Sequence, residues 1–416
     1  MNLSHSLPAL AIDPALPQRD LLLDEDLMTD YLSRLMARRG DFGVRDCTRR
    51  RTKYRFGTSL RVLYELSGND GSYRIAARAF PTTHRVAHQM HSVGIPAPEL
   101  NTIFWIFPHD RKIKNLSVLS DIPHELRNIA GETWTRSRIA GYAPEKALTA
   151  QCLNDDDKVL AYAKVYAGDE GRVIFNTHVH VEASLRGRLH VPRALSYSDS
   201  HHLLLLEPIT GVSLATLGSN HREAAFFLLG KSLKQFHRIS PPLSVSESTR
   251  LTPAALRQAA TVISEARPDA ASIVQRLNRQ LLARQEEFNS TNVVLLHGDV
   301  HPKNVLLDRD QRLFLLDLDQ AAVGAAAVDL GSVIAGLYYD ACTGSLSLRE
   351  ASSLKRAFLS GYGACASSLR WHIAAALLEE RALRAVSRVR VGGLKKLAEI
   401  LAMAESWLAG ESISEN

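Results

Sequence analysis

Six polar side chains lie close together in the second half of the sequence, and their types could support metal-dependent chemistry. Residues 293–319 read VVLLHGDVHPKNVLLDRDQRLFLLDLD, and the polar positions between the short apolar runs are His297, Asp299, His301, Asn304, Asp317 and Asp319. A carboxylate beside a buried strand is costly to desolvate unless it has a partner such as a cation. If Asp299, Asn304 and Asp317 converge on one cleft, they would suit Mg²⁺, which prefers oxygen ligands.

The same residues permit two other interpretations. His297, Asp299 and His301 alternate along the chain, and with Asp317 they could ligate zinc or iron in a metal-dependent hydrolase. That site would leave Asn304 without a role and would explain nothing in the first half of the chain. The side chains could also merely cap loops, which does not account for their order.

That order resembles the catalytic core of the aminoglycoside phosphotransferase and choline kinase superfamily, whose members are small-molecule kinases with a protein-kinase-like fold. The resemblance is carried by His297-Gly298-Asp299-x-His301-x-x-Asn304, by Leu316-Asp317 and by Val328-Asp329-Leu330. It implies that Asp299 is the catalytic base and that Asn304 and Asp317 hold the Mg²⁺ ions that bridge the ATP phosphates. It also implies that Asp329 braces the catalytic loop.

Such a kinase needs a strand lysine that contacts the ATP phosphates and pairs with a glutamate on the next helix. The run LAYAKVY offers Lys164, and a lysine in so apolar a strand is uncommon unless it is paired. Glu182 on the following helical stretch is the expected partner, with Glu170 as a second choice. The alternatives are an exposed edge-strand lysine and a solvated glutamate.

Two further segments are expected to contact the nucleotide. Residues 203–211, LLLLEPITG, resemble the family's hinge between lobes, so backbone groups near Glu207 to Ile209 would bind the adenine edge. The turn before Lys164 reads GYAPEKA over residues 141–147 and lacks the G-x-G-x-x-G pattern of protein kinases. Lys146 or backbone amides in this turn could contact phosphate.

The first half of the chain contains a weak internal repeat. YRFGTSLRVL at Tyr54 aligns with YAPEKALTAQ at Tyr142, and RIAARAF at Arg74 aligns with LAYAKVY at Leu160, at offsets of 88 and 86 residues. We interpret the first copy as a degenerate small lobe that acts as a cap, with Arg78 in the place of Lys164. Chance similarity is the alternative, because strand patterns are short.

The order of elements predicts an α+β fold, because a β-rich part precedes a helix-rich part. We expect a helix over residues 21–36, strands over 54–66, 73–80, 142–153 and 159–166, and mostly helices after 211. The prediction is a two-lobed protein-kinase-like fold with an extra N-terminal β-rich cap. Its expected domains are 1–125 (arm, helix and cap), 126–211 (ATP-binding small lobe) and 212–416 (helical lobe with the catalytic core).

Composition limits the classes of partner. The chain has 416 residues, 45% hydrophobic and 23% charged, with a net charge of +6, which is typical of a globular protein. The densest basic run, Arg49 to Arg51, lacks the interleaved aromatic residues of single-strand nucleic-acid binders, so we expect no nucleic-acid partner. No C-x-x-C pair, signal peptide or membrane-spanning run is found, which predicts a cytoplasmic protein.

The expected function is ATP- and Mg²⁺-dependent transfer of the γ-phosphate to a hydroxyl of a small molecule that is sugar-like, an amino alcohol or an aminoglycoside. Residues 340–416 carry acidic and basic side chains together, which slightly favours a neutral or anionic acceptor over an aminoglycoside. The alternative from another class is a nucleotide-binding protein of kinase-like fold with weak turnover and a scaffold role.

Overall fold

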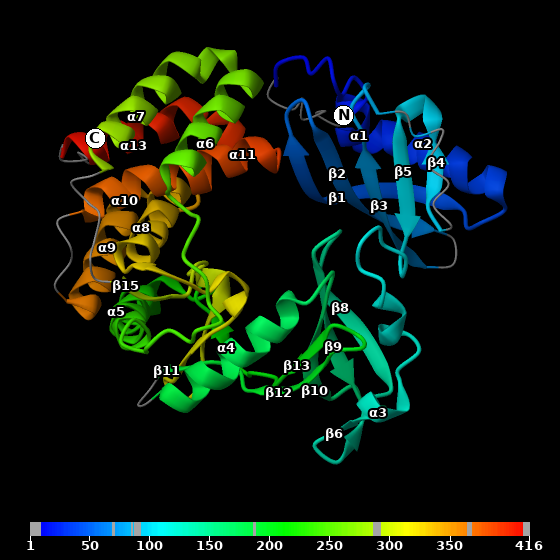
Figure 1. Cartoon of the computed structure of the whole chain (residues 1–416), viewed down its shortest axis with the longest axis horizontal. Coiled ribbons are helices and arrows are strands. Elements are labelled where there is room, and N and C mark those ends of the chain that lie inside the picture. Colours follow the sequence, from blue (N-terminus) through cyan, green and yellow to red (C-terminus); the bar gives the residue numbers. More distant parts are fainter. Residues whose placement is uncertain are drawn as a thin grey trace.

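The computed structural model describes residues 10–68, 71–84, 86, 93–185, 189–285, 293–363 and 368–410. Three parts follow one another along the chain: an N-terminal sheet with two helices, a second sheet, and a large helical part (Figure 1). Asn69 and Asp70, between the strands expected over residues 54–66 and 73–80, lie outside the described residues. In the described part of the chain, no helix is both long and apolar enough to span a membrane.

The N-terminal sheet has five strands in the order β1-β2-β3-β5-β4. The bounds are β1 (Val44–Arg55), β2 (Ser59–Gly68), β3 (Ser72–Ala79), β4 (Ile95–Ala97) and β5 (Thr102–Ile106). The prediction of one strand over residues 54–66 was wrong, because a turn with Gly57 at φ +65° separates β1 from β2.

Two helices accompany this sheet where the sequence predicted one. They are α1 (Arg19–Leu23) and α2 (Glu25–Arg39). Asp24 separates them because its backbone is extended and its side chain accepts a hydrogen bond from the Leu27 N–H, which caps α2. Met28, Leu32 and Met36 are buried on α2, at the spacing of one helix face, and α2 packs against β1.

The second sheet has the same strand order as the first. Its strands run β8-β9-β10-β13-β12, so in both sheets the chain visits the first, second, third, fifth and fourth positions. Their bounds are β8 (Arg136–Ala143), β9 (Ala147–Leu153), β10 (Val159–Tyr166), β12 (Ala194–Ser198) and β13 (Leu203–Leu206). The helix α4 (Glu170–Ser184) follows β10 in the chain, precedes the edge strand β12, and contacts the sheet. The shared order agrees with the internal repeat, while duplication itself stays a prediction.

Short elements connect the two sheets and frame residues 297–304, which the resemblance predicts to be the catalytic loop and which are called by that name below. Between the sheets lie α3 (His124–Arg127), β6 (Asn128–Ile129) and β7 (Glu132–Thr133). Around the loop lie β11 (Leu189–His190), β14 (Val212–Ser213), β15 (Val293–Leu296), β16 (Val305–Leu307), β17 (Leu313–Leu315) and β18 (Ala322–Ala325). β11, β17, β16 and β14 form one small sheet, and β15 pairs with β18.

The helical part begins after β14. Its helices are α5 (Ser219–Phe236), α6 (Pro253–Ala266), α7 (Ala271–Ala283), α8 (Ala327–Cys342), α9 (Leu348–Tyr362), α10 (Leu369–Ala376), α11 (Leu383–Ser387), α12 (Val391–Lys395) and α13 (Leu397–Ala409). A π-helical turn, η8 (Leu377–Ala382), lies between α10 and α11. Such turns occur frequently at functional sites.

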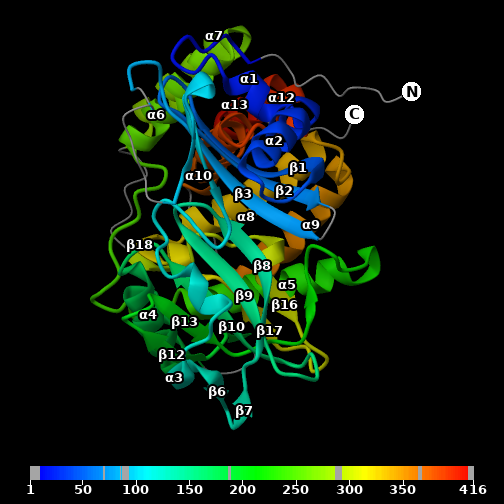
Figure 2. The same ribbon diagram turned by 90° about the vertical axis from the view of Figure 1, so that its right-hand side faces the viewer.

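The N-terminal part packs against the helical part as well as next to the second sheet (Figures 1 and 2). Its buried side chains, such as Leu32 and Phe104, belong to one continuous apolar cluster with those of the helical part, such as Ile263 and Leu401. β1 also contacts α11. The second sheet has a separate core around Trp134 and Leu148. Burial of shared apolar surface therefore holds the N-terminal part on the helical part.

Candidate active site

Lys164 is the point where the two halves of the chain meet. It lies on β10, which pairs with β9 on one side and β13 on the other, and only 8% of the residue is exposed. Its Nζ donates to Asp317 Oδ1 at 2.9 Å and to Asp319 Oδ1 at 2.6 Å. The Tyr166 hydroxyl donates to the same Asp319 oxygen at 3.1 Å. The lysine is therefore in a central strand and paired, as the sequence argument required.

Mutual electrostatics fix the charge states of this cluster. Burial alone would lower the pKa of Lys164, but Asp319 and Asp317 raise it above its ordinary value. Burial opposes ionisation of Asp317, yet Lys164 holds the pKa of this carboxyl well below its usual range. Burial and the Asp317 charge raise the pKa of Asp319. One amine thus faces two carboxylates, which leaves excess negative charge for a further cation.

The backbone around Asp317 places both carboxylates beside the lysine. Asp317 follows β17 and has a left-handed backbone with φ +67°, an uncommon conformation for a residue other than glycine. A short 3₁₀ turn, η7 (Leu318–Gln320), comes directly after it and carries Asp319. The Asp317 side chain stays 42% exposed whereas that of Asp319 is 9% exposed. Asp317 is therefore the carboxylate that an incoming ligand can reach.

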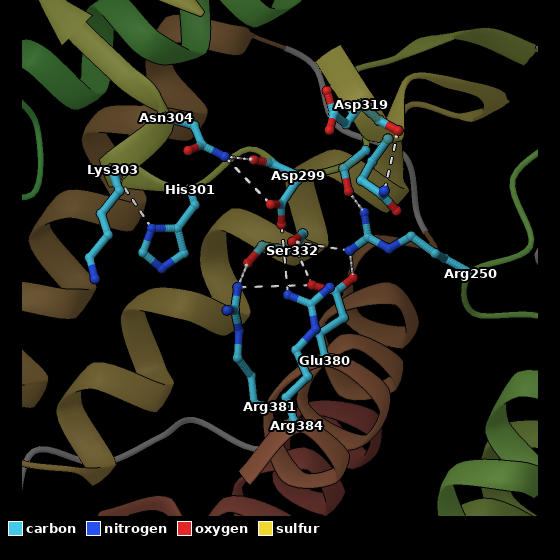
Figure 3. Close-up of polar contacts among 12 residues, drawn as sticks. Arg250, Asp299, His301, Lys303, Asn304, Asp319, Ser332, Glu380, Arg381 and Arg384 are labelled. Carbon is cyan, nitrogen blue, oxygen red and sulfur yellow. Dashed lines mark hydrogen bonds and ion pairs between the residues drawn. The ribbon is translucent and has the colours of Figure 1, made fainter. Parts of the chain in front are cut away.

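The catalytic loop brings Asp299 and Asn304 together. The Asn304 amide donates to the Asp299 backbone oxygen at 3.1 Å and to its Oδ2 at 3.4 Å (Figure 3). Gly298 starts the loop with φ +79°, and a Cβ there would lie 1.9 Å from the Gln320 backbone oxygen. Only glycine fits this close approach, which ties the loop to the segment that carries Asp319.

His297 and Asp329 hold this loop in place through hydrogen bonds to its backbone and to the neighbouring segment. The His297 ring contacts the Leu316 carbonyl through Nε2 at 3.0 Å and accepts from the Asp299 N–H through Nδ1 at 3.3 Å. The fully buried Asp329 accepts from the backbone N–H groups of His297 at 2.8 Å and Gly298 at 3.0 Å. His237 Nε2 contacts the same carboxyl at 3.2 Å and, against the effect of burial, keeps the pKa of Asp329 low.

A second brace comes from arginines that the sequence did not single out. Arg250 donates to the Gly298 carbonyl oxygen and to Glu380. Glu380 also accepts from the Ser332 hydroxyl at 2.6 Å, and Arg381 donates to the Ser332 carbonyl at 2.7 Å (Figure 3). Glu380 and Arg381 both lie in η8, so the π-helical turn directs side chains toward the catalytic loop.

Arg384, one turn further on, approaches the expected base itself. Its guanidinium lies 3.7 Å from Asp299 Oδ1. Both side chains are about one third exposed, at 28% and 34%. The only sequence signal for this residue was a basic cluster over residues 381–390, which does not tell which arginine faces the loop.

The turn between β8 and β9 is held by the N-terminal part. Glu145 in this turn has a 5% exposed side chain that accepts from Arg61 at 3.1 Å, Arg78 at 3.0 Å and Arg111 at 3.1 Å. Asp110 accepts from the Glu145 N–H at 3.0 Å. The expected phosphate-covering turn is therefore anchored by three guanidinium groups, a function that the repeat hypothesis did not assign to Arg78.

The structure does not pair Lys164 with a glutamate of α4. Glu182 and Glu170 are both exposed on that helix, and the α4 side chains that are buried include Ile174, Thr177 and His178. Asp319 takes the place of the expected partner. A sequence signal existed, because an Asp-x-Asp pattern at the end of β17 can place two carboxylates near one buried amine.

The two hinge residues differ in their hydrogen bonds. The Glu207 N–H donates to the Arg193 carbonyl at 3.0 Å, and the Glu207 side chain accepts from the Arg193 N–H at 2.9 Å. Glu207 is thus hydrogen-bonded to Arg193, the residue that directly precedes β12. Within the described residues, Ile209 makes no hydrogen bond, so its backbone groups remain available to a ligand.

The family follows from a comparison with known proteins. Residues 177–391, just over half of the chain, match the model of a phosphotransferase enzyme family. The chain belongs to this family. The matched segment contains the catalytic loop, Asp317 and Asp329, whereas Lys164 precedes it. A search of curated proteins finds no match.

The solved structure of a known phosphotransferase shows the same fold. Spectinomycin phosphotransferase, determined with ADP and spectinomycin, matches at a TM-score of 0.50 with 16% identity. The match covers 67% of the present chain and 94% of the spectinomycin phosphotransferase chain. A choline/ethanolamine kinase family protein from Mesorhizobium loti matches at a TM-score of 0.48 with 14% identity, over 70% of this chain and 96% of that one. About a third of the present chain thus lies outside each of these two matches.

Proposed function

We propose that this family member is an ATP- and Mg²⁺-dependent kinase that moves the γ-phosphate of ATP to a hydroxyl of a small molecule. The observation that carries the proposal is the contact of Lys164 with Asp317 and Asp319, beside the loop of Asp299 and Asn304. An amine, two carboxylates and a carboxamide on neighbouring segments are the groups that phosphoryl transfer requires, because its highly charged transition state needs positioning and cations.

The donor set fits a hard divalent cation. Asp317 is ionised and partly exposed, and Asn304 donates through its amide nitrogen, which leaves its oxygen for a metal. Bound there, Mg²⁺ would neutralise charge on the transferring phosphates. Lys164 would hold the α- and β-phosphates of ATP, and backbone groups of Ile209 would contact the adenine edge. The N–H of Glu207 is already engaged with Arg193, so its carbonyl is the group left for adenine.

Asp299 is the residue that we assign as base. Its carboxylate would orient the acceptor hydroxyl and take its proton as the hydroxyl oxygen bonds to the γ-phosphorus and the bond to the β-phosphate oxygen breaks, releasing ADP. Asn304 holds this carboxylate from one side and Arg384 lies on another. The hydrolase interpretation loses support, because both ring nitrogens of His297 are already hydrogen-bonded.

An acceptor screen tests this proposal. Purified protein is incubated with ATP and Mg²⁺ and a panel of sugars, amino alcohols and aminoglycosides, and phosphorylated product is followed by ³¹P NMR. We expect ADP and one phosphomonoester to form in equal amounts with at least one class. Nucleotide binding without acceptor-dependent turnover would instead favour the scaffold alternative.

A further inference from the structure

A cavity of about 560 Å³ lies where the three parts of the chain meet. The N-terminal strands β1, β2 and β3, the strand β8, the catalytic loop and the segment after η8 all contribute to its walls. Its volume is in the range of small-molecule sites. The charged residues that line it are Arg50, Arg51, Glu65, Arg74, Lys303, Arg388 and Arg390.

Most of these cations have no counter-ion. Glu65 pairs with Arg50 at 2.6 Å and with Arg74 at 3.2 Å. Among the described residues, no acidic side chain forms an ion pair with the other four cations of the cavity, which are Arg51, Lys303, Arg388 and Arg390. The cavity therefore keeps a large positive charge that the protein itself does not neutralise.

The unpaired cations are crowded. Burial and the like charges of Arg384, Arg390 and Arg51 lower the pKa of Arg388 to about 10. Burial, together with Arg61 and Arg390, also lowers the pKa of Arg51. Like charges held close together repel one another, and a bound anion would relieve this repulsion.

The cavity lies near the expected base Asp299, which acts electrostatically on its lining residue Arg388, and it does not include the expected nucleotide site. None of the residues assigned to ATP and Mg²⁺, namely Lys164, Asn304, Asp317 and Asp319, lines it. Lys303 is the chain neighbour of Asn304, and Arg384, whose charge acts on Arg388, lies 3.7 Å from Asp299. An acceptor whose one end lies in this cavity would therefore have to extend past Arg388 toward Arg384 to bring its hydroxyl to Asp299.

We propose that the acceptor is a hydroxyl compound that also carries a strongly anionic group, either a phosphate or a carboxylate. Arg51, Arg388 and Arg390 bind that group, because guanidinium groups pair bidentately with both anions. The N-terminal part is then a wall of the acceptor site, since Arg51 belongs to β1. This inference rests on the proposed kinase function and adds a substrate class to it.

Calorimetry with defined probes tests the inference. The full chain is loaded with Mg²⁺ and a non-hydrolysable ATP analogue, so that the nucleotide site is filled, and is titrated with glucose 6-phosphate, glucuronate, glucose and kanamycin. We expect one anionic probe to bind at least about tenfold more tightly than glucose and kanamycin. Which of the two anions binds better distinguishes phosphate from carboxylate.

Matched variants assign the binding to the cavity. The double variant Arg388→Ala/Arg390→Ala replaces two exposed side chains. It should lower the affinity for the anionic probe at least about tenfold. The control Arg349→Ala removes an exposed arginine of α9 outside the cavity and should leave binding unchanged. Thermal unfolding of all three proteins checks that the fold is retained.

Several results would overturn the inference. It fails if no anionic probe binds, if glucose or kanamycin binds as tightly, or if the double variant binds like the control. It also fails if the ATP analogue displaces the anion, because the cavity would then take the nucleotide phosphates. Phosphorylation of only neutral or cationic acceptors would refute it while the kinase function stands. Anion binding in a protein that never consumes ATP would refute the kinase function instead.

Discussion

Lys164 donates to Asp319 over 2.6 Å, although the two residues are 155 positions apart in the chain. This contact does what a helix glutamate was expected to do, because it holds a buried amine charged and oriented. The partner comes from the turn that also carries Asp317. The same segment therefore supplies the expected metal ligand and the partner of the lysine that is expected to bind phosphate.

The first prediction compares the two candidate partners of that lysine. Asp319→Asn should raise the KM for ATP about tenfold, because it removes one of the two carboxylates that orient Lys164. Glu182→Gln should leave the KM unchanged, since Glu182 is exposed on α4. Steady-state kinetics at varied ATP measure both. An equal rise in the KM for ATP in both variants would contradict this prediction and would indicate that Glu182 contributes to nucleotide binding.

The second prediction concerns Lys164 itself. Lys164→Met should lower kcat/KM for ATP by about 10²–10³, the usual loss when a preorganised charge that stabilises the transition state is removed. Lys231→Met, an exposed lysine of α5, is the matched control and should retain full activity. Loss of activity in both proteins would point to a general effect of lysine removal.

The third prediction addresses the anchor of the β8–β9 turn. Glu145→Ala should raise the KM for ATP and lower stability, because it leaves the guanidinium groups of Arg61, Arg78 and Arg111 close together without their carboxylate. Arg78→Ala should change ATP turnover little, since Arg61 and Arg111 still hold Glu145. Nucleotide titration and thermal unfolding measure these effects. An unchanged KM in Glu145→Ala would separate the turn from nucleotide binding.

The fourth prediction is a dependence of stability on pH. Burial would favour the neutral acid, but His237 lowers the pKa of Asp329 in the folded state, so its carboxylate stabilises the fold above the unfolded pKa of about 4. This contribution is lost as the pH falls through the lower, folded-state pKa. Asp329→Ala should destabilise the protein by about 3–5 kcal/mol at neutral pH.

Denaturant unfolding at several pH values checks this. The difference in unfolding free energy between wild type and Asp329→Ala should shrink as the pH falls from about 4 through the folded-state pKa of Asp329. A difference that grows on acidification would contradict the assignment, because Asp329 would then stabilise the fold in its protonated form.

The sequence predicted the parts of the site that are local in the chain. The spacing of Asp299 and Asn304 predicted that the two side chains would lie together, and the structure shows this contact because one short segment carries both, while their catalytic roles stay a prediction. Lys164 could be found because a lysine in an apolar strand requires a partner. The fold class followed from the order of β-rich and helical stretches.

What could not be predicted depends on contacts between distant segments. The choice of Asp319 over Glu182 is set by the rotation of α4, which turns Thr177 and His178 inward. The anchoring of Glu145 by Arg61 and Arg78 depends on how the N-terminal sheet lies on the second one. The approach of Arg384 to Asp299 depends on the π-helical turn before it, for which residues 377–382 carry no distinctive pattern.

The most direct test of the kinase assignment is the turnover of Asp299→Asn with an acceptor from the screen. We predict a loss in kcat of about 10²–10⁴ with unchanged affinity for Mg²⁺-ATP, because Asp299 is the proposed acceptor of the hydroxyl proton and lies outside the Lys164 cluster. Asp155→Asn, in an exposed turn, serves as the control and should keep its activity. A wild-type rate in Asp299→Asn would contradict the assignment of the catalytic base and with it the proposed mechanism.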